Sequence, residues 1–273
     1  MKKTKHLVGV FDSGVGGLSV LREIRALLPA QPVIYFADQA NVPYGIRQLE
    51  EVRTFARGIS RYLLASGAEL IVVACNTASV AALHMLREEF APIPFVGMEP
   101  AVKPAVEQSL TGKVGVLATE ATFHTSMYAS VVERFAQGVT LYEDPCPGLV
   151  ARVEAGDLSG ADTRHILEQA LLPMMDKGVD TIVMGCTHYP FVIPLIKEIV
   201  GEEVRVIDPA PAIARQVKRV LEAHNLLAAG KRSAPARFIT SGDPAHFQQM
   251  LRILLSEEHQ VSHVNWQDGK VVE

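Results

Sequence analysis

The sequence predicts an α/β protein built from two similar α/β domains with mainly parallel sheets. Short runs rich in Val and Ile alternate with longer segments of helical periodicity along almost the whole chain. Uniformly apolar runs of this kind are typical of parallel strands that are covered by helices on both faces. A weak internal repeat further indicates that one α/β unit is duplicated.

The alternation is continuous from one end of the chain to the other. In the first half the predicted strands are "HLVGVF", "VIYFA", "ELIVVA" and "FVGM", and the predicted helices are "LSVLREIRALL", "VRTFARGISRYLLASG" and "SVAALHMLREEF". The second half continues with the strands "KVGVLA", "VTLYE", "DTIVMG", "VRVID" and "RFITSG", each followed by a helical segment or a loop. Gly and Pro lie between these elements as turn signals.

The internal repeat relates two pairs of segments. "GAELIVVACNTA" aligns with "GVDTIVMGCTHY" and pairs Cys75 with Cys186, while "VGVFDS" aligns with "VGVLAT" and pairs Ser13 with Thr119. Chance is the alternative, because many α/β units share a glycine followed by an apolar strand. True duplication would place both cysteines at equivalent strand ends, where they approach one ligand from opposite sides.

Two proline-rich segments mark the predicted domain boundaries. "EPAVKPAV" predicts a crossover out of the first domain, and "VIDPAPAIA" predicts a return to it. The first domain is therefore expected to comprise residues 1–98 and 209–273, and the second to comprise residues 99–208. We expect the functional site in the cleft between them.

Length, charge and cysteine content exclude several classes of protein. A chain of 273 residues can bury a core without disulfides or metals. With a net charge of −4 and no basic run longer than "MKKTKH", nucleic acid is not expected as the main partner. Three unclustered cysteines indicate free thiols in a reducing cytoplasm. No signal-like or membrane-spanning apolar segment is found, so we expect a cytoplasmic protein without a membrane partner.

Two of the three cysteines stand out by their position. Cys75 and Cys186 each end a predicted strand and begin a predicted helix, where unpaired N–H groups favour a thiolate. A buried structural role is the alternative for one such cysteine, but two in matched positions favour a functional role. Cys146 lies between prolines in a loop and is interpreted as structural. The polar residues that follow the two cysteines, and that can cap a helix or hold a ligand, are Asn76, Thr77, Thr187 and His188.

"FDSGVGGLS" is a glycine-rich turn between a strand and a helix. It does not fit a dinucleotide fingerprint, because Ser19 stands where a glycine is required, and it lacks the Gly-Lys-Ser/Thr of a P-loop. We expect the turn to bind a small anion, with Asp12 and Ser13 projecting into the cleft, although helix capping explains these two residues equally well. Asp38 ends the next strand as a ribose-binding acid would, which leaves a dinucleotide enzyme open.

The loop "NVPYG" is expected at the same edge of the sheet. Pro43 and Gly45 shape the turn, and Tyr44 either covers a ligand or packs. Zinc is not expected, because the thiols lack C-x-x-C spacing and the only close Cys/His pair is Cys186 and His188. A Ser-His-Asp hydrolase lacks the G-x-S-x-G motif.

Four motifs together resemble the glutamate racemases of the aspartate/glutamate racemase superfamily. They are "FDSGVGGLSV", "ADQANVPYG", "ACNTAS" and "GCTHYP", in this order and spacing. The resemblance implies two similar α/β domains with the active site between them. It also implies cofactor-independent racemisation of L-glutamate to D-glutamate, which would supply peptidoglycan synthesis.

The resemblance further implies roles for individual residues. Cys75 and Cys186 match two catalytic cysteines, one of which deprotonates each enantiomer at Cα while the other reprotonates the opposite face. Asp12 and His188 match polar residues that assist the respective thiols, and Glu154 in "LVARVEAG" matches an acid on the second side. The residues that match the substrate-binding motifs, with Thr119 added through its repeat partner, are Asp12, Ser13, Pro43, Tyr44, Gly45, Asn76, Thr77, Thr119, Thr187 and His188. No cofactor or metal is implied.

Chemistry gives an independent reason for two cysteines, because inverting a stereocentre requires a base on one face and an acid on the other. Two other hypotheses stay open. An aspartate or other amino-acid racemase of the same superfamily would share the motifs. A two-domain amino-acid binding protein would use the same cleft, although binding needs no thiolates. The apolar helices could form the interface of a homodimer, but they could equally well belong to the core, so both alternatives stay open.

Overall fold

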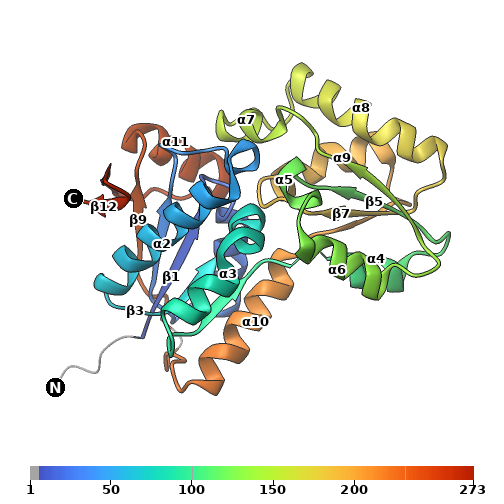
Figure 1. Ribbon diagram of the computed structural model, residues 1–273. Helices are drawn as coiled ribbons and strands as arrows, with labels where there is room; N and C mark the ends of the chain where they lie inside the picture. Colours follow the sequence, from blue (N-terminus) through green and yellow to red (C-terminus); the bar gives the residue numbers. More distant parts are fainter. Residues whose placement is uncertain (1–5, 100, 231) are drawn as a thin grey trace.

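The structure is a computed structural model that describes residues 6–99, 101–230 and 232–273 (Figure 1). Most of the opening basic run, and Pro100 of the predicted crossover, lie outside the described residues. Within these ranges no helix combines the length and the apolarity needed to span a membrane.

The chain forms two parallel sheets, which confirms the predicted fold class. The larger sheet has the order β10-β9-β2-β1-β3-β4 and the smaller has the order β6-β5-β7-β8, and every pairing within them is parallel. The strands of the larger sheet are β1 (Leu7–Asp12), β2 (Val33–Ala37), β3 (Ala68–Val73), β4 (Phe95–Gly97), β9 (Ala236–Thr240) and β10 (Val261–His263). Those of the smaller are β5 (Lys113–Leu117), β6 (Thr140–Asp144), β7 (Thr181–Met184) and β8 (Arg205–Ile207).

The strand orders confirm the internal repeat. The run β2-β1-β3-β4 in one sheet corresponds, strand for strand, to β6-β5-β7-β8 in the other. Cys75 follows β3 and Cys186 follows β7, so the two cysteines occupy equivalent places. Ser13 after β1 and Thr119 after β5 are equivalent in the same way.

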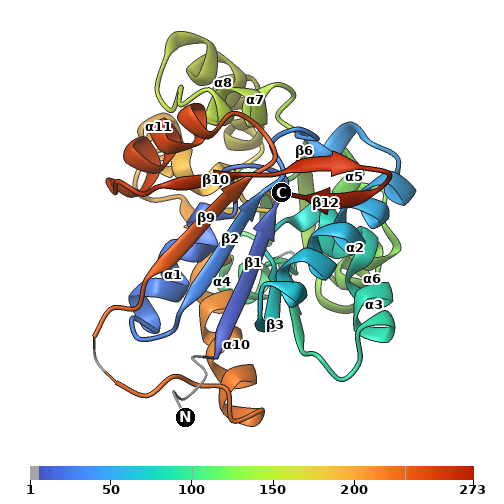
Figure 2. The same cartoon turned by 90° about the vertical axis from the view of Figure 1, so that its left-hand side faces the viewer.

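Helices cover both faces of each sheet (Figures 1 and 2). On β1, Val8 and Val10 join one apolar cluster and Phe11 joins another, because successive side chains of a strand point to opposite faces. On the larger sheet, α1 (Leu18–Leu27), α10 (Ala210–Ala223) and α11 (Pro244–Leu255) belong to the first cluster, and α2 (Leu49–Ala65) and α3 (Asn76–Glu89) to the second. On the smaller sheet, α7 (Leu149–Glu154), α8 (Ala161–Asp176) and α9 (Ile193–Val200) lie on one face, with α4 (Val102–Gln108) and α6 (Ser126–Phe135) on the other.

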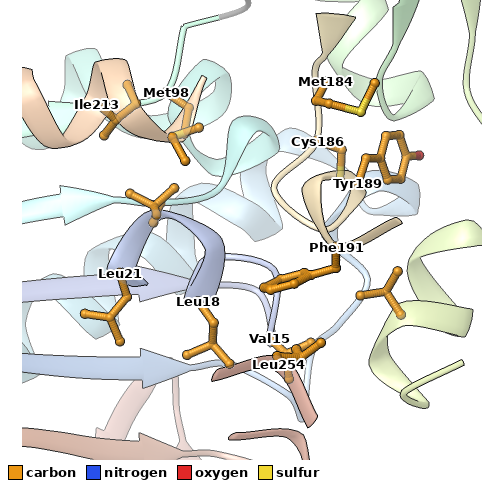
Figure 3. Packing of buried hydrophobic residues seen from close by; sticks show 14 of the residues in the cluster. Val15, Leu18, Leu21, Met98, Met184, Cys186, Tyr189, Phe191, Ile213 and Leu254 are labelled. Carbon is orange, nitrogen blue, oxygen red and sulfur yellow. The ribbon is translucent and has the colours of Figure 1, made fainter. Parts of the chain in front are cut away.

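One apolar core runs between the two sheets. The cluster that holds Val15 and Leu18 also holds Met184, Tyr189 and Phe191 of the second half (Figure 3). Burial of each such side chain contributes about 1.5–3 kcal/mol. The ends of β1 and β7 are therefore held together by packing.

The segments predicted to cross between the domains do connect the two sheets. The chain passes from β4 to β5 by way of α4, and it returns after β8 through α10, which packs against α1. The boundary residues themselves stay a prediction. The C-terminal strand β10 and the antiparallel hairpin of β11 (Asn265–Gln267) and β12 (Lys270–Val272) were not predicted, because each has only three residues and none of these residues is fully buried.

Candidate active site

A cavity lies where the carboxyl ends of β1, β3, β5 and β7 approach one another. The cavity is nearly closed, because only about 20 Å³ of it admits the centre of a water-sized sphere, while the surrounding space of about 280 Å³ between atoms includes open solvent. Its lining residues are Ser13, Pro43, Tyr44, Gly45, Cys75, Asn76, Thr77, Thr119, Val150, Cys186, Thr187 and His188. Apart from Val150, all of these residues were singled out in the sequence. The remaining two candidates, Asp12 and Glu154, lie behind the lining.

Cys75 is the N-cap residue of α3, as predicted. Its Sγ accepts a hydrogen bond from the Ala78 backbone N–H at 3.4 Å and lies 3.9 Å from Ser13 Oγ. Burial raises the pKa of the Cys75 thiol well above its usual value, and the nearby charge of Asp12 adds to this effect. Burial therefore opposes the expected thiolate at this helix start, and it outweighs the backbone N–H groups of Ala78 and Ser13, which lower the pKa.

Cys186 does not begin an α-helix, contrary to the prediction. It is followed by a 3₁₀ helix, η2 (Tyr189–Val192), and α9 starts only afterwards. Pro190 and Pro194 explain this, since proline lacks the N–H that a continuous helix would use and is tolerated only in a first turn. The Cys186 Sγ lies 3.7 Å from His188 Nδ1.

His188 and Glu154 form a buried ion pair behind Cys186. The distance from His188 Nε2 to Glu154 Oε1 is 2.6 Å, and the two side chains are 2% and 12% exposed. Burial alone would lower the pKa of His188, but hydrogen bonds to Cys186 and Glu154 and their charges raise that pKa well above its usual value. For Glu154, burial alone would raise the pKa, but the hydrogen bond from His188 lowers it below its usual value. An imidazolium therefore lies beside the Cys186 sulfur.

The glycine-rich turn binds a carboxylate of the protein itself. The Val15 N–H donates to Glu154 Oε1 at 2.8 Å. A Cβ at Gly14 would lie 1.9 Å from the same oxygen, and one at Gly16 would lie 2.4 Å from His188 Nδ1. The expected anion site is thus filled by Glu154, and these glycines allow second-domain side chains to approach the turn.

Asp12 caps the turn rather than projecting into the cavity. Its Oδ2 accepts from the Gly14 N–H at 3.1 Å, and its Oδ1 accepts from Thr187 Oγ1 at 3.3 Å. Burial raises the pKa of Asp12, against the opposing charge of His188. Asp12 thus stabilises the turn but does not cap α1, whose N-cap is Gly17 without a side-chain hydrogen bond, whereas Ser13 does line the cavity.

Asn76 offers the clearest unfilled hydrogen-bonding capacity in the cavity. The side chain is 2% exposed, and neither its Oδ1 nor its Nδ2 has a partner among the described residues. Buried amides are normally paired, because an unmade hydrogen bond costs about 1–3 kcal/mol. A ligand with both donor and acceptor groups would satisfy it. Across the cavity, the hydroxyls of Thr77 and Thr119 lie 3.1 Å apart.

Tyr44 is fixed from behind the cavity. It begins a short 3₁₀ helix, η1 (Tyr44–Ile46), inside the predicted loop, and its hydroxyl donates to Asp38 Oδ2 at 2.6 Å. Asp38 also accepts hydrogen bonds from Asn41, Ser241 and Trp266. Because protein donors occupy this carboxylate, the comparison of Asp38 with a ribose-binding acid loses its basis.

Sequence reasoning missed two residues of the site. Val150 lines the cavity from α7, and Gln39 donates to Glu154 Oε2 at 3.3 Å. Val150 lies four residues before Glu154 and so shares its helix face, which is a signal that the sequence contains. Gln39 lies in the motif "ADQANVPYG", which marks its loop but not its contact with Glu154. Across the described ranges, no three His, Cys, Asp or Glu side chains are grouped so that they could hold a metal ion.

Two duplicated α/β domains with a thiol from each at one buried cavity are what an enzyme acting on both faces of a small molecule would require. The family model described as Asp/Glu/Hydantoin racemase matches residues 8–217. The chain belongs to this family, and it is an enzyme of the amino-acid racemase class.

The curated relatives that this chain resembles are glutamate racemases. A glutamate racemase of Pseudomonas paraeruginosa is 50% identical over 258 residues, which is 94% of this chain and 97% of that protein. One of Pseudomonas aeruginosa is 52% identical over 90% of this chain and 93% of that protein. The resemblance to the glutamate racemases that the four motifs indicated is thereby confirmed.

The fold agrees with solved structures of the same name. The glutamate racemase isoform RacE1 of Bacillus anthracis superposes with a TM-score of 0.87 at 34% identity, over 96% of this chain and 98% of that one. Escherichia coli glutamate racemase, solved in complex with L-glutamate and the activator UDP-MurNAc-ala, gives a TM-score of 0.85 at 33% identity, over 99% and 100% of the two chains.

Proposed function

We propose that the protein interconverts L- and D-glutamate without a cofactor, with Cys75 and Cys186 acting on opposite faces of Cα. The observation that carries this proposal is that both thiols line one cavity from equivalent strand ends of duplicated sheets. The relatives at about half identity support glutamate as the substrate. As part of the same proposal, the reaction takes place in the cytoplasm and supplies D-glutamate to peptidoglycan synthesis.

In the proposed reaction, one cysteine as thiolate removes the Cα proton and the other as thiol delivers its own proton to the opposite face. The enzyme then carries the thiolate on the other side and catalyses the reverse direction. The His188 imidazolium stabilises negative charge on the Cys186 sulfur by electrostatic attraction. The buried Cys75, with its raised pKa, favours the thiol.

The carbanion formed at Cα needs hydrogen-bond donors at fixed positions, in a site from which water is excluded. The cavity offers the Asn76 amide and the hydroxyls of Ser13, Thr77, Thr119 and Thr187 for the substrate carboxylates. Asp12 and Glu154 act from behind the lining, Asp12 on the glycine-rich turn and Glu154 on His188.

The proposal is tested with L-glutamate in D₂O, by following optical rotation and the α-proton signal together. Cys75→Ser and Cys186→Ser should each abolish racemisation, and each can leave exchange with one enantiomer only. Cys146→Ser is the matched control, because Cys146 is buried but does not line the cavity, and it should keep full turnover. Full turnover by either of the first two variants would sink the two-base mechanism.

The same assay separates the alternatives. Higher turnover efficiency with aspartate than with glutamate would identify an aspartate racemase of the same family. Tight reversible binding of glutamate without α-proton exchange would identify a binding protein.

A further inference from the structure

A hydrogen-bonded path leads from the cavity wall to the C-terminal hairpin. Tyr44, which lines the cavity, donates its hydroxyl to Asp38 Oδ2 at 2.6 Å. On the other oxygen of this carboxylate, the Trp266 indole N–H donates to Oδ1 at 2.7 Å, and Ser241 Oγ donates at 2.7 Å. Asp38 is fully buried. An indole can only donate, so the carboxylate is an acceptor shared between the cavity residue and the hairpin.

A second path joins the same two residues through stacked rings. The Tyr44 ring stacks on Phe55 with centroids 5.6 Å apart, and the Phe55 ring contacts Trp266 with centroids 5.5 Å apart. The helix that carries Phe55 leaves room for the indole at Gly58, where a Cβ would lie 2.7 Å from Trp266 Cζ3. Tyr44 is thus connected to Trp266 by one polar and one aromatic route.

The hairpin contributes no side chain to the cavity lining. It lies against α2 (Figure 2) and beyond residues 8–217, to which the family model extends. We propose that Trp266 is a positioning residue of the active site, which holds Tyr44 in place through Asp38 and Phe55. A test by enzymatic activity rests on the proposed function, whereas a test by hydrogen exchange of the loop amides does not.

Loss of the indole N–H leaves Asp38 with one donor fewer and loosens its hold on Tyr44. Trp266→Phe keeps a ring against Phe55 but removes this donor, and Trp266→Leu removes both. We expect the KM for glutamate to rise about tenfold in the first variant, as for loss of one hydrogen bond to a charged group, and further in the second. The kcat should change less than the KM, because the thiols are not moved.

The control and the coupling test both come from the same region. Tyr62→Phe removes a hydroxyl that contacts Glu273 next to the hairpin but not Asp38, and it should leave the KM unchanged. Combined with Tyr44→Phe, which removes the hydroxyl of the polar route, Trp266→Phe should add little further effect. Fully additive effects, or a KM that does not change in Trp266→Phe, would overturn the proposal.

Hydrogen exchange measures the loop without any reaction. In Trp266→Phe the amides of residues 39–47 should exchange faster than in the wild type, and in Tyr62→Phe they should not. Gly58→Ala, which displaces the indole without altering it, should act in the same direction. If the wild type fails to racemise glutamate, the proposed function fails while the exchange data still decide the role of Trp266. Unchanged exchange in both Trp266→Phe and Gly58→Ala would refute that role.

Discussion

At the scale of single residues, the two cysteines occupy equivalent strand ends but different electrostatic surroundings. Cys75 lies near the buried Asp12, whose charge raises the pKa of the thiol further than burial alone. Cys186 lies 3.7 Å from the ring of His188, whose pKa is raised by its hydrogen bonds to Cys186 and Glu154. The duplicated architecture therefore gives the cysteines two similar positions, and a few neighbouring side chains make their electrostatic surroundings unequal.

Hydrogen bonds to Cys186 and Glu154, together with the charges of these two groups, hold the pKa of His188 above its usual range. Glu154→Gln should lower the pKa of His188, because the amide keeps a hydrogen-bond acceptor but not the negative charge. NMR titration of the imidazole Cε1–H measures this, with the signal assigned by its absence from His188→Asn. An unchanged pKa would show that Cys186 alone sustains the imidazolium.

The same pair makes stability depend on pH in a defined direction. The pKa of His188 is raised on folding, so its contribution is complete below about pH 6.5 and is lost as the pH rises through the folded value. The pKa of Glu154 is lowered, so its contribution is present above about pH 4.3 and is lost as the pH falls through the folded value. The measurement is the free energy of unfolding in urea as a function of pH. In Glu154→Gln this free energy should depend less on pH on both the acid and the alkaline side. An unaltered pH dependence would contradict the ion pair.

Substitution of Asn76 should weaken ligand binding while leaving the stability of the fold nearly unchanged. Its amide has no partner among the described residues, so Asn76→Ala removes no hydrogen bond and should change the free energy of unfolding by no more than about 1 kcal/mol. If the amide holds a substrate carboxylate, the KM for glutamate should rise roughly 10- to 100-fold. A large loss of stability with an unchanged KM would assign Asn76 to the core instead.

The sequence predicted the site residues unevenly, for physical reasons. Cys75 and Cys186 follow from the repeat, because equivalent strands of duplicated sheets must end at equivalent places. Glu154 followed only from the family resemblance, since it reaches the site from α7 without a motif of its own. The pKa shifts of Cys75 and Asp12 depend on burial, which local sequence does not reveal.

At the scale of elements, the glycine-rich turn is shaped by the side chains that it admits. Gly14 faces Glu154 and Gly16 faces His188, so the turn of one domain fits the catalytic candidates of the other. The strands β1–β9 could be predicted because they are apolar runs between helical segments. The strands β10–β12 could not, because three residues with exposed positions carry no periodic signal.

Gly16→Ala should impair activity by more than its effect on stability explains. The new Cβ would overlap His188 Nδ1, and overpacking of this kind costs about 1–3 kcal/mol. Gly138→Ala is the matched control, because its φ of +76° makes a side chain similarly costly, at about 1–2 kcal/mol, while nothing lies within 4 Å of the new Cβ. Both should lower the melting temperature, but only Gly16→Ala should lower kcat. Equal kcat values in the two variants would show that His188 tolerates displacement.

At the scale of the whole molecule, two sheets of matching strand order share one apolar core. The two-domain architecture could be predicted from the repeat, whereas the packing of Val15 and Leu18 against Phe191 could not. Contacts between distant segments depend on the relative orientation of the domains, and the sequence repeat does not specify that orientation.

A ligand that bridges both domains should stabilise the folded protein as a unit. At a glutamate concentration one hundred times its Kd, the free energy of unfolding should rise by about 2.7 kcal/mol. Thermal melting with L-glutamate, D-glutamate and L-aspartate at equal concentrations measures this. We expect both glutamate enantiomers to raise the melting temperature more than aspartate, and the reverse order would favour an aspartate racemase.

The hydroxyls of Thr77 and Thr119 join the two domains directly across the cavity. Each hydroxyl can donate one hydrogen bond and accept two, so this contact leaves both with capacity for a ligand. A carboxylate held by both hydroxyls would therefore be bound by both halves of the molecule at once, and Thr77→Val or Thr119→Val should weaken its binding from opposite sides.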